Sequence, residues 1–266
     1  MTRGDEAPIA SRDNPRFKRL RRLVEDAAAY RRDGLVWIEG DHLLRALLAR
    51  GGRPQAVVLT PQAEPLWHEM RAAAGLGADA VPRWRLTPAL MAALTQLASP
   101  AALAALWPLP PAAVPEPEAP TVVLDRVQDP GNVGSILRSA AAFGFAQVLA
   151  LRGTAALWSP KVLRAGMGAH FGLRLSEGLA PDDLAGLRVP LLATSSHQGE
   201  WLHRARLPWP CAWVFGHEGQ GVQPALRARA ARTLRIAQPG GEESLNVAAA
   251  AAICLHASAV QRAGAG

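Results

Sequence analysis

The segment LDRVQDPGNVGSILRSAAAFGF, residues 124–145, predicts a strand, a tight turn and a helix in direct succession. Its Pro-Gly pair favours the turn, and Asn132 is suited to cap a helix over Val133–Phe143. The start of such a helix offers N–H groups and the positive end of a dipole, which can hold a phosphate, and Arg138 adds a forked donor. The segment lacks the GxGxxG dinucleotide motif, and taken alone it also fits an ordinary strand–helix turn.

Short apolar strands continue to alternate with helices along the second half of the chain. Parallel strands joined through helices are buried on both faces, so this pattern predicts an α/β domain built on a parallel sheet. The expected strands are Val122–Leu124, Gln147–Leu151, Leu191–Ala193, Ala212–Phe215 and Thr233–Ile236. The expected helices are Val133–Phe143, Lys161–Gly166, Asp182–Leu187, Pro224–Ala231 and Asn246–Ala259.

Two further loops follow predicted strands, at the sheet edge where ligands of parallel α/β proteins collect. In AWVFGHEGQGV, residues 212–222, three glycines within six residues let the backbone approach a ligand closely. Glu218 lies among them and is hard to explain by packing, because a carboxylate is rarely buried without a partner. A flexible surface loop is the alternative interpretation of this stretch.

The third loop begins in LRIAQPGGEESLNVAAA, residues 234–250. A turn at Pro239–Gly241 leads to Ser244 and Asn246, which stand at the mouth of a long alanine-rich helix. Either polar residue could act only as the N-cap of that helix. Each of the three loops is therefore ambiguous when it is considered alone.

The proline-rich segment WPLPPAAVPEPEAP, residues 107–120, divides the chain in two. Proline at this density forces extended backbone and predicts a semi-rigid linker. The division places a first domain at residues 1–107, the linker at 108–119 and a second domain at 120–266. The first domain is expected to be a small α/β domain. Its expected elements are a helix over Asn14–Arg32, a strand over Leu35–Gly40, a helix over Asp41–Arg50 and a strand over Gln55–Thr60.

Basic residues cluster in and around the first expected helix. The chain carries 29 Lys+Arg against 22 Asp+Glu, a formal net charge of +7, and such a surplus favours a polyanionic partner. The cluster fits either an RNA-binding surface or a solvated helix face. Nearly all of the positive charge is arginine, whose planar fork suits phosphates, although a GC-rich genome gives the same bias. The members are Arg16, Lys18, Arg19, Arg21, Arg22, Arg31 and Arg32.

Composition excludes several classes of protein. With 49% hydrophobic residues the chain can bury a core and is not disordered by composition. Cys211 and Cys254 lie outside any CxxC pattern, so we expect neither a disulfide framework nor a metal site, and the histidines show no ligand spacing. We find no secretory signal and no membrane span. A soluble, cytoplasmic protein without a metal is expected.

Taken together and in order, the three loops remove the ambiguity. DPGNVGSILRSAAAFG, then FGHEGQG, then IAQPGGEESLNVAAA closely resemble the three motifs of the SpoU (TrmH-like) family of RNA ribose 2′-O-methyltransferases, in the SPOUT superfamily. The resemblance covers about residues 120–262. The first half is more loosely similar to the family's RNA-binding domain, which resembles a ribosomal protein, through NPRFKRLRRL and LVWIEGDHLL.

This resemblance implies a catalytic domain with a trefoil knot, S-adenosylmethionine as cofactor and a homodimer. The implied reaction is methylation of a ribose 2′-hydroxyl in a structured RNA. We expect 23S ribosomal RNA, because a leading RNA-binding domain is more typical of ribosomal-RNA members than of transfer-RNA members. The alternatives are a transfer-RNA 2′-O-methyltransferase, an inactive RNA-binding module of the same fold, and an enzyme that methylates a base nitrogen.

The resemblance also implies roles for particular residues. Asn132 and Arg138 of the first motif are expected at the ribose and phosphate, where Arg138 pairs with a phosphate and orients the hydroxyl. The other expected catalytic residues are Glu218, Ser244 and Asn246. Expected cofactor contacts are Thr194, Gly216, Ile236 and Leu245. Expected RNA-binding residues are Arg16, Lys18, Arg19, Arg31 and Arg32.

Overall fold

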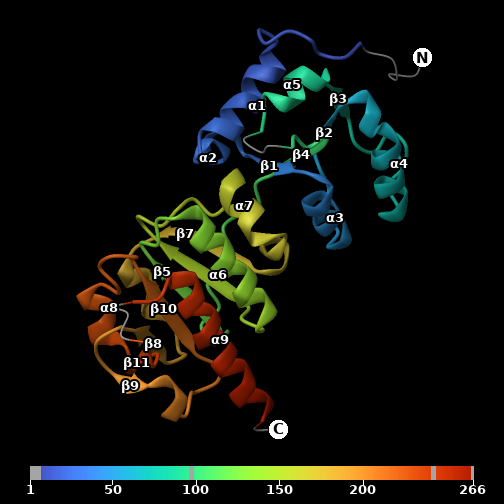
Figure 1. The fold of residues 1–266 in the computed structure, drawn as a ribbon. Helices are drawn as coiled ribbons and strands as arrows, with labels where there is room; N and C mark the ends of the chain where they lie inside the picture. Colours follow the sequence, from blue (N-terminus) through green and yellow to red (C-terminus); the bar gives the residue numbers. More distant parts are fainter. Residues whose placement is uncertain (1–6, 96–98, 241–243, 265–266) are drawn as a thin grey trace. The chain divides into compact units, whose positions relative to one another are not determined.

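A computed structural model describes residues 7–95, 99–240 and 244–264. The chain divides into two compact units (Figure 1). The first comprises Met1–Pro110 together with Trp158–Arg164, and the second comprises Pro111–Leu157 together with Ala165–Gly266. The division falls inside the proline-rich segment. The grouping of Trp158–Arg164 with the first unit is a feature that the order of elements along the chain does not indicate.

The first unit is built on a four-stranded sheet in the order β1-β4-β2-β3. Its pairs β1/β4 and β4/β2 are antiparallel, and β2/β3 is parallel. The strands are β1 (Leu35–Glu39), β2 (Ala56–Leu59), β3 (Arg83–Arg85) and β4 (Leu103–Pro108). The helices are α1 (Pro15–Glu25), α2 (Ala29–Asp33), α3 (Asp41–Ala49), α4 (Glu64–Ala73) and α5 (Pro88–Ala92), with the 3-10 turn η1 (Pro61–Ala63).

The single helix expected over Asn14–Arg32 is wrong, because two helices cover this range. Asn14 caps α1 by accepting a hydrogen bond from the Arg16 N–H at 2.9 Å. At Asp26 the backbone becomes extended, and the Asp26 side chain accepts a hydrogen bond from the Ala28 N–H at 2.9 Å. An aspartate that bonds the backbone two residues ahead competes with the helix and ends it.

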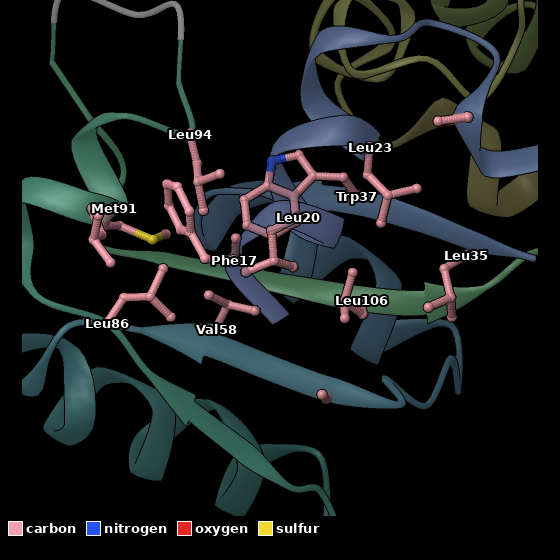
Figure 2. Close-up of a cluster of buried hydrophobic side chains, with 14 residues drawn as sticks. Phe17, Leu20, Leu23, Leu35, Trp37, Val58, Leu86, Met91, Leu94 and Leu106 are labelled. Atoms are coloured by element: carbon pink, nitrogen blue, oxygen red, sulfur yellow. The ribbon is translucent and has the colours of Figure 1, made fainter. Parts of the chain in front are cut away.

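One apolar cluster forms the core between α1 and the sheet of the first unit (Figure 2). Leu20 and Leu23 of α1 lie in it with Trp37 of β1, and all three side chains are buried. Val58 and Leu106 contribute from β2 and β4. The pattern follows from the sequence, because residues three apart lie near one face of a helix, whereas alternate residues share one face of a strand.

The second unit is built on a seven-stranded sheet in the order β7-β6-β5-β10-β8-β11-β9, and every pairing is parallel. The five expected strands are confirmed, with each end within one residue of its expected place. The edge strands β7 and β9 were not expected. The strands are β5 (Thr121–Asp125), β6 (Gln147–Leu151), β7 (Arg174–Leu179), β8 (Leu191–Thr194), β9 (Glu200–Trp201), β10 (Ala212–Gly216) and β11 (Arg232–Arg235).

Helices α6 and α9 pack side by side in the second unit (Figure 1). The expected helix over Asp182–Leu187 is a 3-10 helix, η3, instead of an α-helix. No helix in the described ranges has the length and apolarity required to cross a membrane. The remaining elements are α6 (Pro130–Ala142), α7 (Pro160–Gly166), α8 (Pro224–Arg229), α9 (Val247–Ala263), η2 (Ala169–Gly172), η3 (Pro181–Gly186) and η4 (Leu202–Arg204).

The proline-rich segment is bound to the sheet of the second unit instead of forming a detached spacer. The Ala113 N–H donates to the carbonyl of Leu175, and the Ser176 hydroxyl donates to the carbonyl of Ala113 at 2.6 Å. Further along, the Glu116 N–H donates to Oε1 of Gln147 at 2.9 Å. These bonds fix the approach of the chain to β5.

The strand order brings the ends of non-consecutive strands together. The chain leaves β5 for β6 and β7 on one side, whereas β10 and β8 lie on the other side. This reversal is the kind of switch point at which open α/β sheets bind ligands. Gly216 is in register with Asp125, and Leu234 with Thr194. The loops that follow β5, β8, β10 and β11 therefore start at the same edge.

Candidate active site

A cavity of about 470 Å³ lies where the loops after β8, β10 and β11 meet the start of α9. Its volume is in the range of small-molecule sites. All four residues expected to contact a cofactor line it: Thr194 ends β8, Gly216 ends β10, Ile236 follows β11 and Leu245 precedes α9. These four residues are brought together by the order of the strands in the sheet, which differs from the order of the strands along the chain.

The loop after β10 is folded tightly on itself. His217 and Gly221 exchange two backbone hydrogen bonds, of 3.1 and 2.8 Å. A Cβ atom on Gly216 would lie 2.1 Å from the carbonyl carbon of Gly221, so only glycine fits there. Gly221 has a φ of +65°, which also favours glycine. This geometry favours a structured loop over a flexible surface loop.

Glu218 is the point at which the second motif contacts the first. Its carboxylate accepts hydrogen bonds from the backbone N–H groups of Gln128 and Asp129, at 3.2 and 3.1 Å, and from the side-chain amide of Asn132 at 3.1 Å. Partial burial alone would raise the pKa of this carboxyl. The hydrogen bonds outweigh that effect and hold the pKa below its ordinary value. Glu218 therefore acts as an ionised acceptor that anchors the loop after β5.

The third motif joins the same network through Asn246. Its Nδ2 donates to Oδ1 of Asn132 at 2.9 Å. Its Oδ1 also caps α9, because it accepts hydrogen bonds from the N–H groups of Ala248 and Ala249 at 2.9 and 3.2 Å. Asn246 is thus an N-cap and a contact between motifs at once. Asn246, Asn132 and Glu218 form one chain of hydrogen bonds.

The expectation that Asn132 caps α6 is wrong. The helix starts three residues earlier than expected, at Pro130, and its N-cap is Asp129. Oδ1 of Asp129 accepts the hydrogen bond of the Asn132 N–H at 2.7 Å. The Asn132 N–H, one of the helix-start groups that were expected to hold a phosphate, is therefore occupied by the Asp129 carboxylate.

Arg138 and Ser244 stand apart from the network. Arg138 is exposed on α6, forms no hydrogen bond or ion pair with any residue that the structure describes, and does not line the cavity. Ser244 is exposed at the rim and lines the cavity. Gly241, the end of the expected Pro239–Gly241 turn, lies outside the described residues. The structure thus brings together Asn132, Glu218 and Asn246, but not Arg138.

Sequence reasoning missed Asp125, a fully buried carboxylate at the end of β5. Its oxygens accept hydrogen bonds from the backbone and the side chain of Gln223, at 2.7 and 2.9 Å, and from Nε of Arg126 at 2.9 Å. Asp125 therefore ties the loop after β10 to the end of β5. The sequence did contain a signal for Asp125, because an acidic residue at the end of the apolar run TVVLD is unusual in a buried strand.

Sequence reasoning also missed Arg227 and Gln238, which line the cavity. Nε of Arg227 and Oε1 of Gln238 are buried and have no hydrogen-bond partner within the described ranges. Nothing in the sequence signalled them, because their place depends on the strand order. Across the same ranges, no three His, Cys, Asp or Glu side chains gather in a group that could hold a metal ion.

The five expected RNA-binding residues of the first unit all have partners. Lys18 pairs with Asp13, and Arg32 pairs with Asp26. Such pairs are exposed and contribute little stability, so they remain available to a phosphate. Acidic side chains therefore lie beside at least two of the five basic residues. The other three are Arg16, over the Trp84 ring, Arg19, bonded to the Asp33 carbonyl, and Arg31, over the Tyr30 ring.

Similar proteins agree in the class of reaction. The chain is 31% identical to an uncharacterized tRNA/rRNA methyltransferase of Synechocystis, over 95% of this chain and 93% of the relative. It is 29% identical to the 23S rRNA guanosine 2′-O-methyltransferase RlmP of Bacillus subtilis, over 82% and 86%. An S-adenosylmethionine-bound rRNA methyltransferase structure from Sinorhizobium meliloti matches with a TM-score of 0.81 and 25% identity, over 95% of this chain and 97% of that chain.

The match to a family model covers the whole of the network and the cavity. The model of the SpoU rRNA methylase family matches residues 119–256. This range includes the loop after β5, the folded loop after β10 and the start of α9. The chain therefore belongs to the SpoU rRNA methylase family.

Proposed function

We propose that this protein transfers a methyl group from S-adenosylmethionine to a ribose 2′-hydroxyl of ribosomal RNA, with 23S RNA as the favoured substrate. One observation carries the proposal: the cavity lined by the four expected cofactor residues is joined, through Glu218, to Asn132 and Asn246. An inactive RNA-binding module has no need of such a network beside a small-molecule cavity. The relative RlmP is a 23S rRNA methyltransferase, which supports the choice of 23S RNA as substrate.

The residues of the cavity fit S-adenosylmethionine. Apolar side chains of Leu234, Ile236 and Leu245 can receive the adenine ring, and backbone groups of the folded loop lie beside them. The buried, unpaired Oε1 of Gln238 is an acceptor that an amino group of the ligand would satisfy. When bound, this molecule supplies a sulfonium methyl group that is open to attack by an oxygen.

The protein's contribution is to hold the acceptor hydroxyl in place. Alignment of two reactants can lower a barrier by roughly 7–11 kcal/mol. The Asn246–Asn132–Glu218 chain fixes the start of α6, the helix that carries Arg138. A guanidinium stays protonated in proteins, so Arg138 is assigned to the phosphate beside the target ribose. There it orients the hydroxyl, and the proton leaves to phosphate or solvent.

The site is completed in a homodimer. Arg138 does not line the cavity of its own chain, so it serves the cavity of a second copy. Helix α9, which packs against α6, exposes Ile253 and Val260 at 41% and 55% of their surfaces. Burial of these apolar side chains against a second copy would stabilise the dimer.

The second unit is proposed to contain a trefoil knot. The connections from β8 to β9, from β9 to β10 and from β10 to β11 each pass over at least one other strand of the sheet. Such interleaved connections are unusual among α/β folds. They support the proposal of a threaded chain.

The first unit is proposed to select the RNA, and the protein to act in the cytoplasm. Two free, buried cysteines are consistent with a reducing compartment. Replacement of both Arg31 and Arg32 by glutamine should weaken RNA binding and reduce its salt dependence, without a change in cofactor affinity. Unchanged RNA affinity would remove these two arginines from the interface.

Mass spectrometry of nucleosides tests the reaction itself. Ribosomal RNA from a deletion strain should lack one 2′-O-methylated nucleoside, and purified protein with S-adenosylmethionine should restore it. Restoration of a base-methylated nucleoside, or of a modification in transfer RNA alone, would contradict the proposal.

A further inference from the structure

The cavity contains an uncompensated positive charge. Among the described residues that line it, Arg227 is the one with a permanent positive charge. Nη2 of Arg227 donates to the carbonyl of Val222 at 2.9 Å, which holds the guanidinium against the folded loop. Its Nε is buried and has no partner within the described ranges. An unpaired buried donor on a charged group is unfavourable, so a ligand acceptor is expected beside it.

The described side chains that line the cavity do not supply a counter-charge for that donor. Glu218 is the one carboxylate among the described lining residues. Its oxygens face the loop after β5, where they accept hydrogen bonds from Gln128, Asp129 and Asn132. Glu218 and Arg227 form no ion pair. An anionic group of a ligand would therefore be the counter-charge of Arg227.

S-adenosylmethionine has one anionic group, the carboxylate of its methionine part. Its adenosine part is neutral, and its sulfonium and ammonium groups are positive. We propose that Arg227 binds this carboxylate and so fixes the methionine end of the ligand, an inference that rests on the proposed function. The Val222 contact leaves Nε without a partner, and this N–H can donate a charge-assisted hydrogen bond to a carboxylate oxygen.

Isothermal titration of the full chain with three ligands tests this contact without a measurement of activity. The ligands are S-adenosylmethionine, its decarboxylated form and 5′-methylthioadenosine, which lacks both carboxylate and ammonium. Wild type should bind S-adenosylmethionine roughly tenfold or more tightly than the decarboxylated form, as one charge-assisted hydrogen bond predicts. Arg227→Met should abolish this preference and leave the affinity for 5′-methylthioadenosine unchanged.

Two further variants separate the contact from damage to the loop. Arg227→Gln keeps a donor for the Val222 carbonyl but removes the charge, and it should lose the same preference. Arg229→Met makes the same change of charge two residues away, where the exposed guanidinium donates to the Pro181 carbonyl at 2.7 Å and does not line the cavity. This control should retain the wild-type preference. Because each preference is a ratio measured on one variant, the fraction of folded protein does not affect it.

Three results would overturn the inference: an unchanged preference in Arg227→Met, an equal loss of affinity for all three ligands, or a loss of RNA binding alone. The last would assign Arg227 to a phosphate of the RNA. Failure of wild type to bind any of the three ligands would be a different result, because it would overturn the proposed function as well.

Discussion

The side-chain amide of Asn246 donates a 2.9 Å hydrogen bond to the side-chain oxygen of Asn132, across 114 positions of the chain. The side-chain amide of Asn132 in turn donates a hydrogen bond to the carboxylate of Glu218. The asymmetry of the amide group is what makes this possible, because each asparagine accepts on one side and donates on the other. One polar chain thereby links the start of α9, the start of α6 and the loop after β10.

Variants of Asn246 should separate its two roles. Asn246→Ser keeps an N-cap for α9 but lacks the amide that reaches Asn132, so it should lower turnover while the free energy of unfolding stays near wild type. Asn246→Ala should lower turnover and also reduce stability by about 1 kcal/mol, the typical loss of an N-cap. Denaturant titration and single-turnover kinetics measure both quantities. Full activity in Asn246→Ser would show that only the cap matters.

Glu218 should contribute stability that depends on pH. Its pKa in the folded protein lies below the ordinary value of 4.5, so the unfolded state binds a proton more readily. The contribution is present above pH 4.5 and disappears as the pH falls through the lowered pKa. The stability difference between wild type and Glu218→Gln should therefore shrink between pH 6 and pH 3. A difference that stays constant over this range would contradict the assignment.

His170 should make the second unit sensitive to mild acid. It is buried, and burial lowers its pKa to about 4, although its hydrogen bond with the Leu157 carbonyl acts in the opposite direction. The unfolded state takes up a proton near pH 6.5, so stability is full above this pH and falls below it, by about 2 kcal/mol at pH 5. Denaturant titration of His170→Phe should show a much weaker dependence over the same range.

The central strands were predictable because each is a short apolar run that is buried on both faces. Thr121–Asp125 and Ala212–Gly216 are of this kind. The edge strand Arg174–Leu179 was missed, because its only large apolar residues are Leu175 and Leu179 and one end is exposed. Asp129 was missed as the cap of α6, although proline at the first helical position after it is a known signature.

The site was predictable only in part, because sequence motifs name residues but not their partners. The three motifs pointed to Asn132, Glu218 and Asn246, and the hydrogen bonds among them depend on β10 lying next to β5. No periodicity in the sequence specifies that neighbour. Arg227 illustrates the same limit, because it enters the cavity from a helix that carries no motif residue.

Arg138 should act on the transition state and not on cofactor binding. It is not among the described residues that line the cavity of its own chain, so Arg138→Ala should leave the dissociation constant of S-adenosylmethionine within a few-fold of wild type. Turnover should fall by at least about a hundredfold, as the loss of a positioning group does. Arg138→Lys should remain mostly inactive, because a point charge lacks the fork. Full rescue by lysine would show that charge alone suffices.

Mixed dimers should reveal whether Arg138 serves the cavity of a second copy. A second variant, Ala250→Phe, fills the cavity from α9 and should abolish cofactor binding while Arg138 stays intact. Each variant alone should be inactive. After the two are unfolded together and refolded, some dimers combine the intact Arg138 of one chain with the intact cavity of the other, so part of the activity should return. If Arg138 acts within its own chain, each of the two sites in a mixed dimer still contains one of the two substitutions. No activity then returns. Native mass spectrometry of the same mixture distinguishes mixed dimers from the two parent dimers, so an inactive mixture that contains mixed dimers would decide against the shared site.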